Sequence, residues 1–238
     1  MPSDFFLGQT AAEWKQNLPP GAKKAWMACH FSPCGTGLSN LPTQLPPGSM
    51  VIVDDQMPVA DHDPVLIAAQ LEALVAEGNC QRILLDFQRP GQPRTAQIAQ
   101  AIASRLPCPV GVSHWYAGSL NCSVFVPPLP LQTLLQRHIA PWEGRKLWLE
   151  LATDCIACSV TADDCRQEGK APSGLFPHYS ETLYCHYRTE VFADAIVFTL
   201  RRSCADALKL LGATQIECCI GLYQEFAQPE AQETAFFQ

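Results

Sequence analysis

Short runs of apolar residues recur along the chain, end in acidic, aromatic or histidine side chains, and are followed by segments of helical periodicity. Continuous apolar runs of this length are typical of parallel strands that are buried on both faces. The pattern predicts eight strands, at residues 25–31, 50–54, 82–87, 109–112, 124–126, 146–151, 195–200 and 216–222.

Helical segments are predicted between most of these strands. The clearest begins at Asp63-Pro64, a capping residue followed by a first-turn proline, and ends at Gly78-Asn79. A capping box formed by Thr10 and Glu13 predicts an earlier helix over residues 10–18. Further helices are expected at residues 95–106, 129–139 and 204–211.

Eight strands with intervening helices indicate an α/β fold, a closed (β/α)8 TIM-like barrel. The connection between the fourth and fifth strands is too short for a full helix, so we expect one degenerate unit. An open doubly wound sheet is the alternative. Residues 157–161 and 183–187 predict a β-hairpin inserted after the sixth strand, within residues 155–190 of a single domain that spans residues 1–238.

Composition narrows the range of partners. Of the 238 residues, 47% are hydrophobic and only 16% are charged, so much of the surface is expected to be buried in the core or in an oligomer interface. The formal net charge of -7 argues against nucleic acid as a partner, because phosphates would repel an acidic surface.

The twelve cysteines are not expected to form a disulfide scaffold. The start, Met1-Pro2-Ser3-Asp4, lacks the pattern of a secretory signal, and most cysteines lie in apolar segments, so we expect free thiols in the cytoplasm. No apolar run has the length of a membrane span. The pair Cys155 and Cys158 has zinc-ligand spacing, but no second short-spaced pair follows, so no metal is expected. Dinucleotide-binding and phosphate-binding glycine motifs are absent, so no cofactor is expected.

The third strand ends in Asp86-Phe87-Gln88. It resembles the acid-bearing strand of the family 18 glycoside hydrolases, the chitinase-like barrels, which ends in Asp, any residue, Glu. The resemblance implies that Asp86 occupies the position of the Asp that supports the substrate. Gln88 occupies the position of the proton-donating Glu, and an amide cannot donate that proton. The resemblance therefore implies a glycosidase-like barrel whose acid lies elsewhere or whose catalysis has been lost.

Other carboxylates at predicted strand ends can supply the acid. We expect Glu150 or Glu225 as the acid and Asp55 or Asp86 as its partner. Asp54 and Asp55 are neighbours, so at most one of them points inward if the strand continues. The structural alternative is that acidic residues after strands cap helices or bind loop amides.

Side chains at the same ends are candidates for ligand binding, by stacking on a sugar ring or by hydrogen bonding. They are His30, Asp54, Gln88, His114, Trp115, Tyr116 and Tyr223. Rim arginines, including Arg89 and Arg94, are able to meet an anion, but solvated surface is the commoner role for arginine.

The sequence thus predicts a glycoside hydrolase-like barrel that acts on or binds a carbohydrate. Two alternatives stay open, a non-catalytic barrel that binds a carbohydrate or another small molecule, and a structural subunit of a homo-oligomer.

Overall fold

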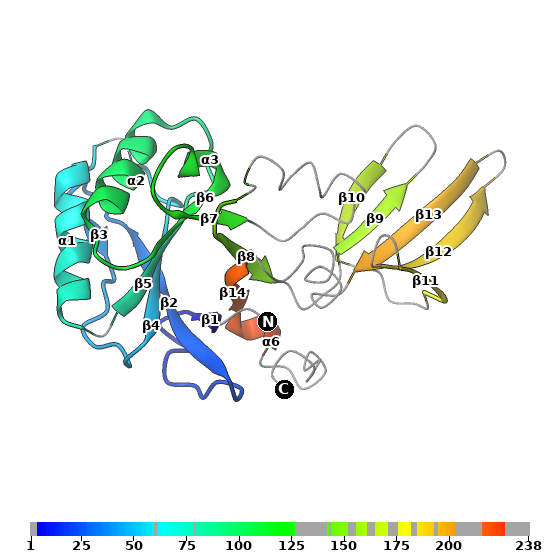
Figure 1. The fold of residues 1–238 in the computed structure, drawn as a ribbon, viewed down its shortest axis with the longest axis horizontal. Coiled ribbons are helices and arrows are strands. Elements are labelled where there is room, and N and C mark those ends of the chain that lie inside the picture. The colour runs from blue at the N-terminus through cyan, green and yellow to red at the C-terminus, as the bar shows by residue number, and fades with distance from the viewer. Residues whose placement is uncertain are drawn as a thin grey trace.

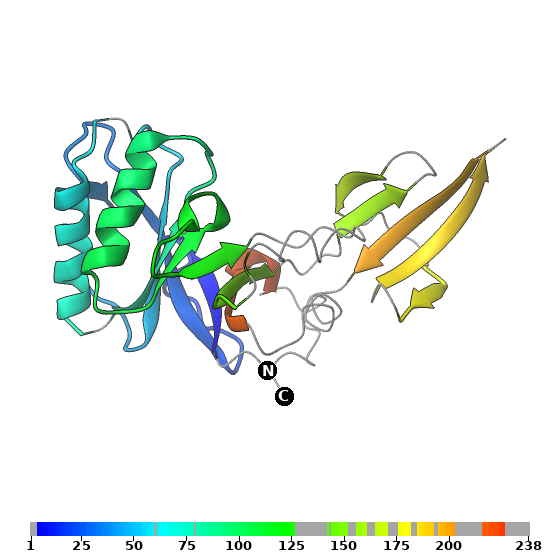
Figure 2. The ribbon, with the colours of Figure 1, turned by 45° about the horizontal axis from the view of Figure 1, so that its top comes forward.

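The fold is described here from a computed structural model. It describes residues 4–59, 61–78, 80–126, 142, 144–151, 156–160, 165–170, 176–181, 185–192, 195–202 and 216–226. Two β-sheets account for all the strands among these residues, and they lie apart from each other in both views of the ribbon (Figures 1 and 2).

The first sheet closes on itself as a barrel of parallel strands. Each strand pairs with the next around the ring, and β1 pairs with both β14 and β2, so the ring has no open edge. In ring order the strands are β1 (Asp4–Gln9), β2 (Ala22–Phe31), β4 (Ser49–Asp54), β5 (Cys80–Asp86), β6 (Val110–Ser113), β7 (Ser123–Val126), β8 (Leu147–Leu151) and β14 (Ile216–Leu222). The short strand β3 (Leu38–Ser39) adds to β2 in the antiparallel sense. The predicted closed eight-stranded barrel is confirmed, and the open sheet is not found.

Two full helices lie against the outside of the barrel among the described residues. The helices α1 (Pro64–Ala76) and α2 (Pro93–Arg105) lie side by side against it (Figure 1). Asp63 caps α1 through its side chain, as expected. Only the single turn α3 (His114–Ala117) lies between β6 and β7, which confirms the degenerate unit. The last described turn, α6 (Tyr223–Phe226), follows β14 directly.

Two apolar clusters form the core, one inside the barrel and one between the barrel and its helices. The inner cluster is built from alternate strand residues, namely Phe6, Ala25, Met50, Ile52, Leu84, Phe125, Trp148, Cys218 and Ile220. Trp148 is fully buried, and its indole N–H donates to Glu217 at 2.9 Å. Gly111 faces this ring, since a Cβ placed there would lie 2.1 Å from Trp148 Cε3. The inner packing therefore requires glycine at position 111.

The prediction of a first helix over residues 10–18 is wrong, and the prediction missed strand β1. The capping-box bonds do form, since Glu13 Oε2 accepts from Thr10 N at 2.9 Å and from Thr10 Oγ1 at 2.8 Å. However, Gln9 Nε2 donates to the carbonyl oxygen of Glu13 at 2.9 Å, and Lys24 Nζ donates to the carbonyl of Trp14. Side chains thus take carbonyls that a longer helix would use, and the segment folds as successive turns.

An insertion of β-strands follows the predicted sixth strand, as expected, but it forms a sheet of five strands in place of a single hairpin, and the predicted seventh barrel strand belongs to that sheet. The second sheet is antiparallel, in the order β10 (Cys165–Lys170), β9 (Ile156–Val160), β13 (Ala195–Arg202), β12 (Cys185–Phe192) and β11 (His178–Ser180). The two expected strands lie in β9 and β12, but β13 separates them and pairs with both. The run at residues 195–200 therefore belongs to this sheet, and β1 takes its place in the barrel.

Some expectations lie beyond what the structure describes. The predicted helices at residues 129–139 and 204–211 fall outside the described residues. The single-domain division of the chain stays a prediction. None of the described helices is long and apolar enough to cross a membrane.

Candidate active site

Three acidic side chains point into the carboxyl-terminal mouth of the barrel. Asp54, Asp86 and Glu150 each lie two residues beyond an inner core residue of the same strand. Those core residues are Ile52, Leu84 and Trp148. Because side chains alternate along a strand, the acids continue the inner face into the mouth. The register pairs His30 with Asp54 and Asp54 with Asp86, so three neighbouring strands present these residues at one level.

A cavity of about 240 Å³ lies at this mouth. It brings together the predicted residues Asp86, Gln88, His114 and Glu150, which come from three different strand ends. The remaining lining residues are Phe87, Ser113, Trp115 and Phe125. The cavity therefore combines two carboxyl groups with an amide, an imidazole and exposed aromatic surface.

The surroundings of Glu150 favour the protonated form of its carboxyl group near neutral pH. Burial, and after it the negative charges of Asp86 and Glu225, together raise the pKa of its carboxyl group from 4.5 to about 7. A carboxylic acid with such a pKa can donate a proton to a reacting group at neutral pH.

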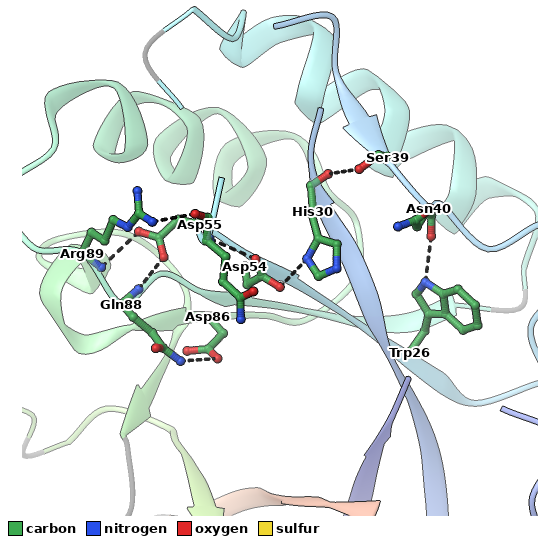
Figure 3. Close-up of polar contacts among 10 residues, drawn as sticks. Trp26, His30, Ser39, Asn40, Asp54, Asp55, Asp86, Gln88 and Arg89 are labelled. Atoms are coloured by element: carbon green, nitrogen blue, oxygen red, sulfur yellow. Dashed lines mark hydrogen bonds and ion pairs between the residues drawn. The ribbon is translucent and has the colours of Figure 1, made fainter. Parts of the chain in front are cut away.

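The pKa of the Asp86 carboxyl group is also raised. Its carboxyl pKa is raised from 3.8 to about 6, mainly by burial and also by the charges of Asp54 and Asp55. The side-chain amide of Gln88 opposes this rise, donating from Nε2 to Asp86 Oδ2 at 3.1 Å (Figure 3). Because the negative charge of Asp86 raises the pKa of Glu150, ionisation of Asp86 favours the protonated form of Glu150.

Asp54 and His30 form a second polar pair at the mouth. Asp54 Oδ2 lies 2.6 Å from His30 Nδ1, and Asp54 Oδ1 accepts from the backbone N–H of Gln56 at 3.0 Å (Figure 3). The imidazole keeps 30% of its side-chain surface exposed and the carboxyl 11%. The pair is ordered by these bonds, and its imidazole stays accessible.

Asp55 points away from the mouth and binds the loop between β5 and α2. It is only 2% exposed, and its two oxygens accept the backbone N–H groups of Gln88 at 2.8 Å and Arg89 at 3.0 Å (Figure 3). This is the loop-amide role that the sequence offered as the structural alternative. By holding this loop, Asp55 positions Gln88, whose side chain lines the cavity.

Tyr116 also positions this loop. Its hydroxyl donates to the carbonyl of Arg89 and accepts from the backbone N–H of Gln92 at 3.1 Å. Its ring packs edge-on against Phe87, with centroids 6.0 Å apart. Tyr116 therefore supports the cavity from outside it.

Glu225 and Tyr223 lie in α6, immediately after β14, and neither lines the described cavity. The charge of Glu225 is still close enough to raise the pKa of Glu150. Of the two carboxyl groups expected as the acid, Glu150 is thus the one inside the cavity.

Two lining residues, Ser113 and Phe125, were missed by the sequence reading. Ser113 Oγ donates to the carbonyl of Leu85 at 3.0 Å, and Phe125 belongs to the inner core. Both occupy inward positions near strand ends, and strand alternation is the signal that could have found them. Trp115, which was predicted from the sequence, is 55% exposed, and the centroid of its ring lies 4.1 Å from that of His114.

No group of three or more His, Cys, Asp or Glu side chains that could hold a metal ion occurs among the described residues. Cys155, one of the pair with zinc-ligand spacing, lies outside the described residues, and only the backbone of Cys158, in β9, is described.

Comparisons with known proteins support the fold. No protein-family model matches the chain, and no curated protein matches it. Among solved structures, the chain is similar to the spore cortex-lytic enzyme SleL of Bacillus megaterium QM B1551, with a TM-score of 0.52 and 8% sequence identity. The similarity covers 96% of this chain and 73% of that one. The chain is thus a (β/α)8-type barrel of the same overall fold as this lytic enzyme.

Proposed function

We propose that the chain is a glycoside hydrolase-like barrel that binds a carbohydrate at its carboxyl-terminal mouth and cleaves a glycosidic bond there. Glu150 is the general acid in this proposal, and Asp86 is the ionised partner. The observation that carries it is that these two carboxyl groups line one cavity, where burial raises both pKa values and the charge of Asp86 favours the protonated form of Glu150.

The chemistry follows from the two protonation states. Protonated Glu150 donates its proton to the glycosidic oxygen, which becomes a neutral leaving group. The carboxylate of Asp86 stabilises the positive charge that develops at the anomeric carbon. Water then forms a new C–O bond at that carbon, and the proton that it releases returns to Glu150. Trp115 offers an exposed ring at the edge of the cavity, on which a sugar can stack. The reaction should then be fastest near pH 6.5, between about 6 for Asp86 and about 7 for Glu150.

The similarity to SleL supports this proposal through the fold. That protein is a spore cortex-lytic enzyme, so the same barrel carries a lytic activity there. The local resemblance of Asp86-Phe87-Gln88 to the family 18 strand supports a carbohydrate as the substrate.

The experiment is a screen for new reducing ends after incubation of the chain with chitin oligosaccharides and with peptidoglycan. Glu150→Gln should reduce any activity by at least about a hundredfold, since the general acid is removed, and Asp86→Asn should also reduce it. Glu72→Gln is the matched control, because Glu72 lies on the outside of α1 and pairs with Arg105. Activity that survives Glu150→Gln would contradict the assignment of the acid.

A second candidate function, carbohydrate binding without catalysis, is favoured by one observation. Gln88 occupies the acid position of the resembled motif, and its amide is hydrogen-bonded to Asp86. In that case the wild-type chain binds an oligosaccharide in calorimetry but releases no reducing ends. Hydrolysis that appears in Gln88→Glu would then identify the barrel as a lapsed enzyme.

A further inference from the structure

A second and larger cavity, of about 490 Å³, lies at the start of α2, and the proposed function does not use it. It is bounded by the loop after β4 and by the loop and first turn that follow β5. Its lining residues are Asp55, Pro58, Val59, Arg89, Gln92, Pro93, Arg94, Thr95 and Gln97. Arg89 lines this cavity while its neighbour Gln88 lines the mouth cavity, so the two cavities flank the same loop.

The lining residues of this cavity carry a net positive formal charge, although the whole chain has a net charge of -7. Two guanidinium groups line it. Arg89 is oriented by a bond from Nη2 to the carbonyl of Gln56 at 2.5 Å, and Arg94 by a bond from Nη1 to Gln97 Oε1 at 2.9 Å. The opposing carboxylate, Asp55, has both oxygens bonded to backbone N–H groups. The two arginines therefore determine the sign of the local potential.

The first turn of α2 adds to this potential. The helix has 13 residues, begins with Pro93, and its N-cap residue Gln92 makes no side-chain capping bond. The positive end of the helix dipole and the first-turn N–H groups thus lie at the cavity without a capping acceptor from Gln92. An oxyanion placed here would be stabilised by the helix start.

Thr95 is the independent observation that points to a ligand. It is 0% exposed and lines the cavity, and its Oγ1 has no hydrogen-bond partner among the residues that the structure describes. A buried hydroxyl without a partner is unfavourable, and such groups often mark a place for a ligand or an ordered ion.

We propose that this cavity is a binding site for an oxyanion, a phosphate or carboxylate group carried by a small ligand. Arg89 and Arg94 supply the opposite charge, the start of α2 supplies backbone donors, and Thr95 Oγ1 supplies a hydroxyl donor. The site goes beyond the proposed hydrolysis and does not depend on it.

The test is a titration of the ¹⁵N-labelled full chain with sodium phosphate, and separately with sodium acetate, at constant ionic strength set by sodium chloride. The expected result is saturable shifts of the backbone amide signals of residues 94 and 95. Saturation by phosphate alone assigns a phosphate group as the ligand chemistry, saturation by acetate alone assigns a carboxylate, and saturation by both anions assigns any small oxyanion.

Variants locate the site. Arg89→Gln and Arg94→Gln should each weaken phosphate binding about tenfold, because each removes a charged donor. Thr95→Val keeps the volume and should weaken it about threefold or more. Arg105→Gln is the control, since Arg105 lies at the other end of the same helix and pairs with Glu72 on the surface.

The proposal is overturned if neither phosphate nor acetate up to about 20 mM causes a saturable shift, because the cavity then binds no oxyanion. It is also overturned if Arg105→Gln weakens binding as much as Arg94→Gln does, because the attraction is then non-specific and due to surface charge. Neither measures hydrolysis, so failure here leaves the carbohydrate proposal to its own test.

Discussion

Replacing Glu150 by glutamine should make the folded chain more stable at alkaline pH. In the folded state the carboxyl group holds its proton up to about pH 7, whereas an ordinary glutamate releases it near pH 4.5. The folded state therefore binds more protons than the unfolded chain between these values, and stability falls as the pH rises through them. Glutamine has almost the same shape and no charge to bury, so the variant avoids this loss.

The magnitude follows from the same two values. Each tenfold change in the acid dissociation constant corresponds to about 1.4 kcal/mol. Raising the pKa of Glu150 from 4.5 to about 7 therefore removes about 3 kcal/mol of stability at pH 8 but only about 1 kcal/mol at pH 5. Glu150→Gln should exceed the wild type by about these amounts in its free energy of unfolding.

Urea unfolding followed by tryptophan fluorescence would measure this difference. The five tryptophans all lie within residues 14–148, so the signal reports the barrel. Glu72→Gln, with its exposed carboxylate, should change stability by less than about 0.5 kcal/mol at both pH values. The reasoning is refuted if Glu150→Gln is no more stable than the wild type at pH 8, or if its advantage is the same at pH 5.

Three further outcomes are expected. Gly111→Ala should lower the free energy of unfolding by about 3 kcal/mol, because its Cβ would overlap the buried Trp148 ring; an unchanged urea midpoint would contradict that packing. Trp115→Ala should weaken binding of a chitin oligosaccharide in calorimetry about tenfold without changing the melting temperature, because a stacked ring is lost from an exposed site; equal affinity would remove Trp115 from the site. Cys34, whose thiol pKa is lowered by hydrogen bonds from Ser32 and Thr36, should react with limiting iodoacetamide before the other seven cysteines that the structure describes; peptide mass mapping that finds one of those labelled first would contradict this.

The barrel could be predicted from the sequence because its strands are continuous apolar runs that end in polar residues. Val51-Ile52-Val53 and Ile83-Leu84-Leu85 are buried on both sides, and this pattern occurs in few other folds. The predicted set of eight barrel strands nevertheless contains one strand that does not belong to the barrel. The run at residues 195–200 has a similar local composition, but it pairs with β9 and β12 in a separate sheet, and pairing partners are not encoded in local periodicity.

The missed strand has a different cause. Asp4–Gln9 is a short run beside a strong capping signal at Thr10 and Glu13, and that signal predicts a helix in this part of the chain. The capping bonds exist, but Gln9 and Lys24 bind the carbonyls that would continue a helix. These contacts are non-local or depend on side-chain direction, so local propensity does not show them.

The candidate site was predictable in part. Alternation along the strands correctly implied that only one of Asp54 and Asp55 faces the mouth, and the structure assigns the inward position to Asp54. The raised pKa values of Asp86 and Glu150 depend on burial and on mutual proximity, which are tertiary properties. The second cavity also depends on tertiary structure, because the fold brings Arg89 and Arg94 together with the buried hydroxyl group of Thr95.

The closure of the barrel through β1 and β14 has a consequence for how the protein is made. β14 lies between β1 and β8, so its neighbours leave the ribosome long before it does. While residues 152–215 are being synthesised, β1 and β8 each present a row of unsatisfied backbone groups to other nascent chains. Chaperone protection should matter most during this interval, and release of the chain before residue 216 should leave an insoluble product.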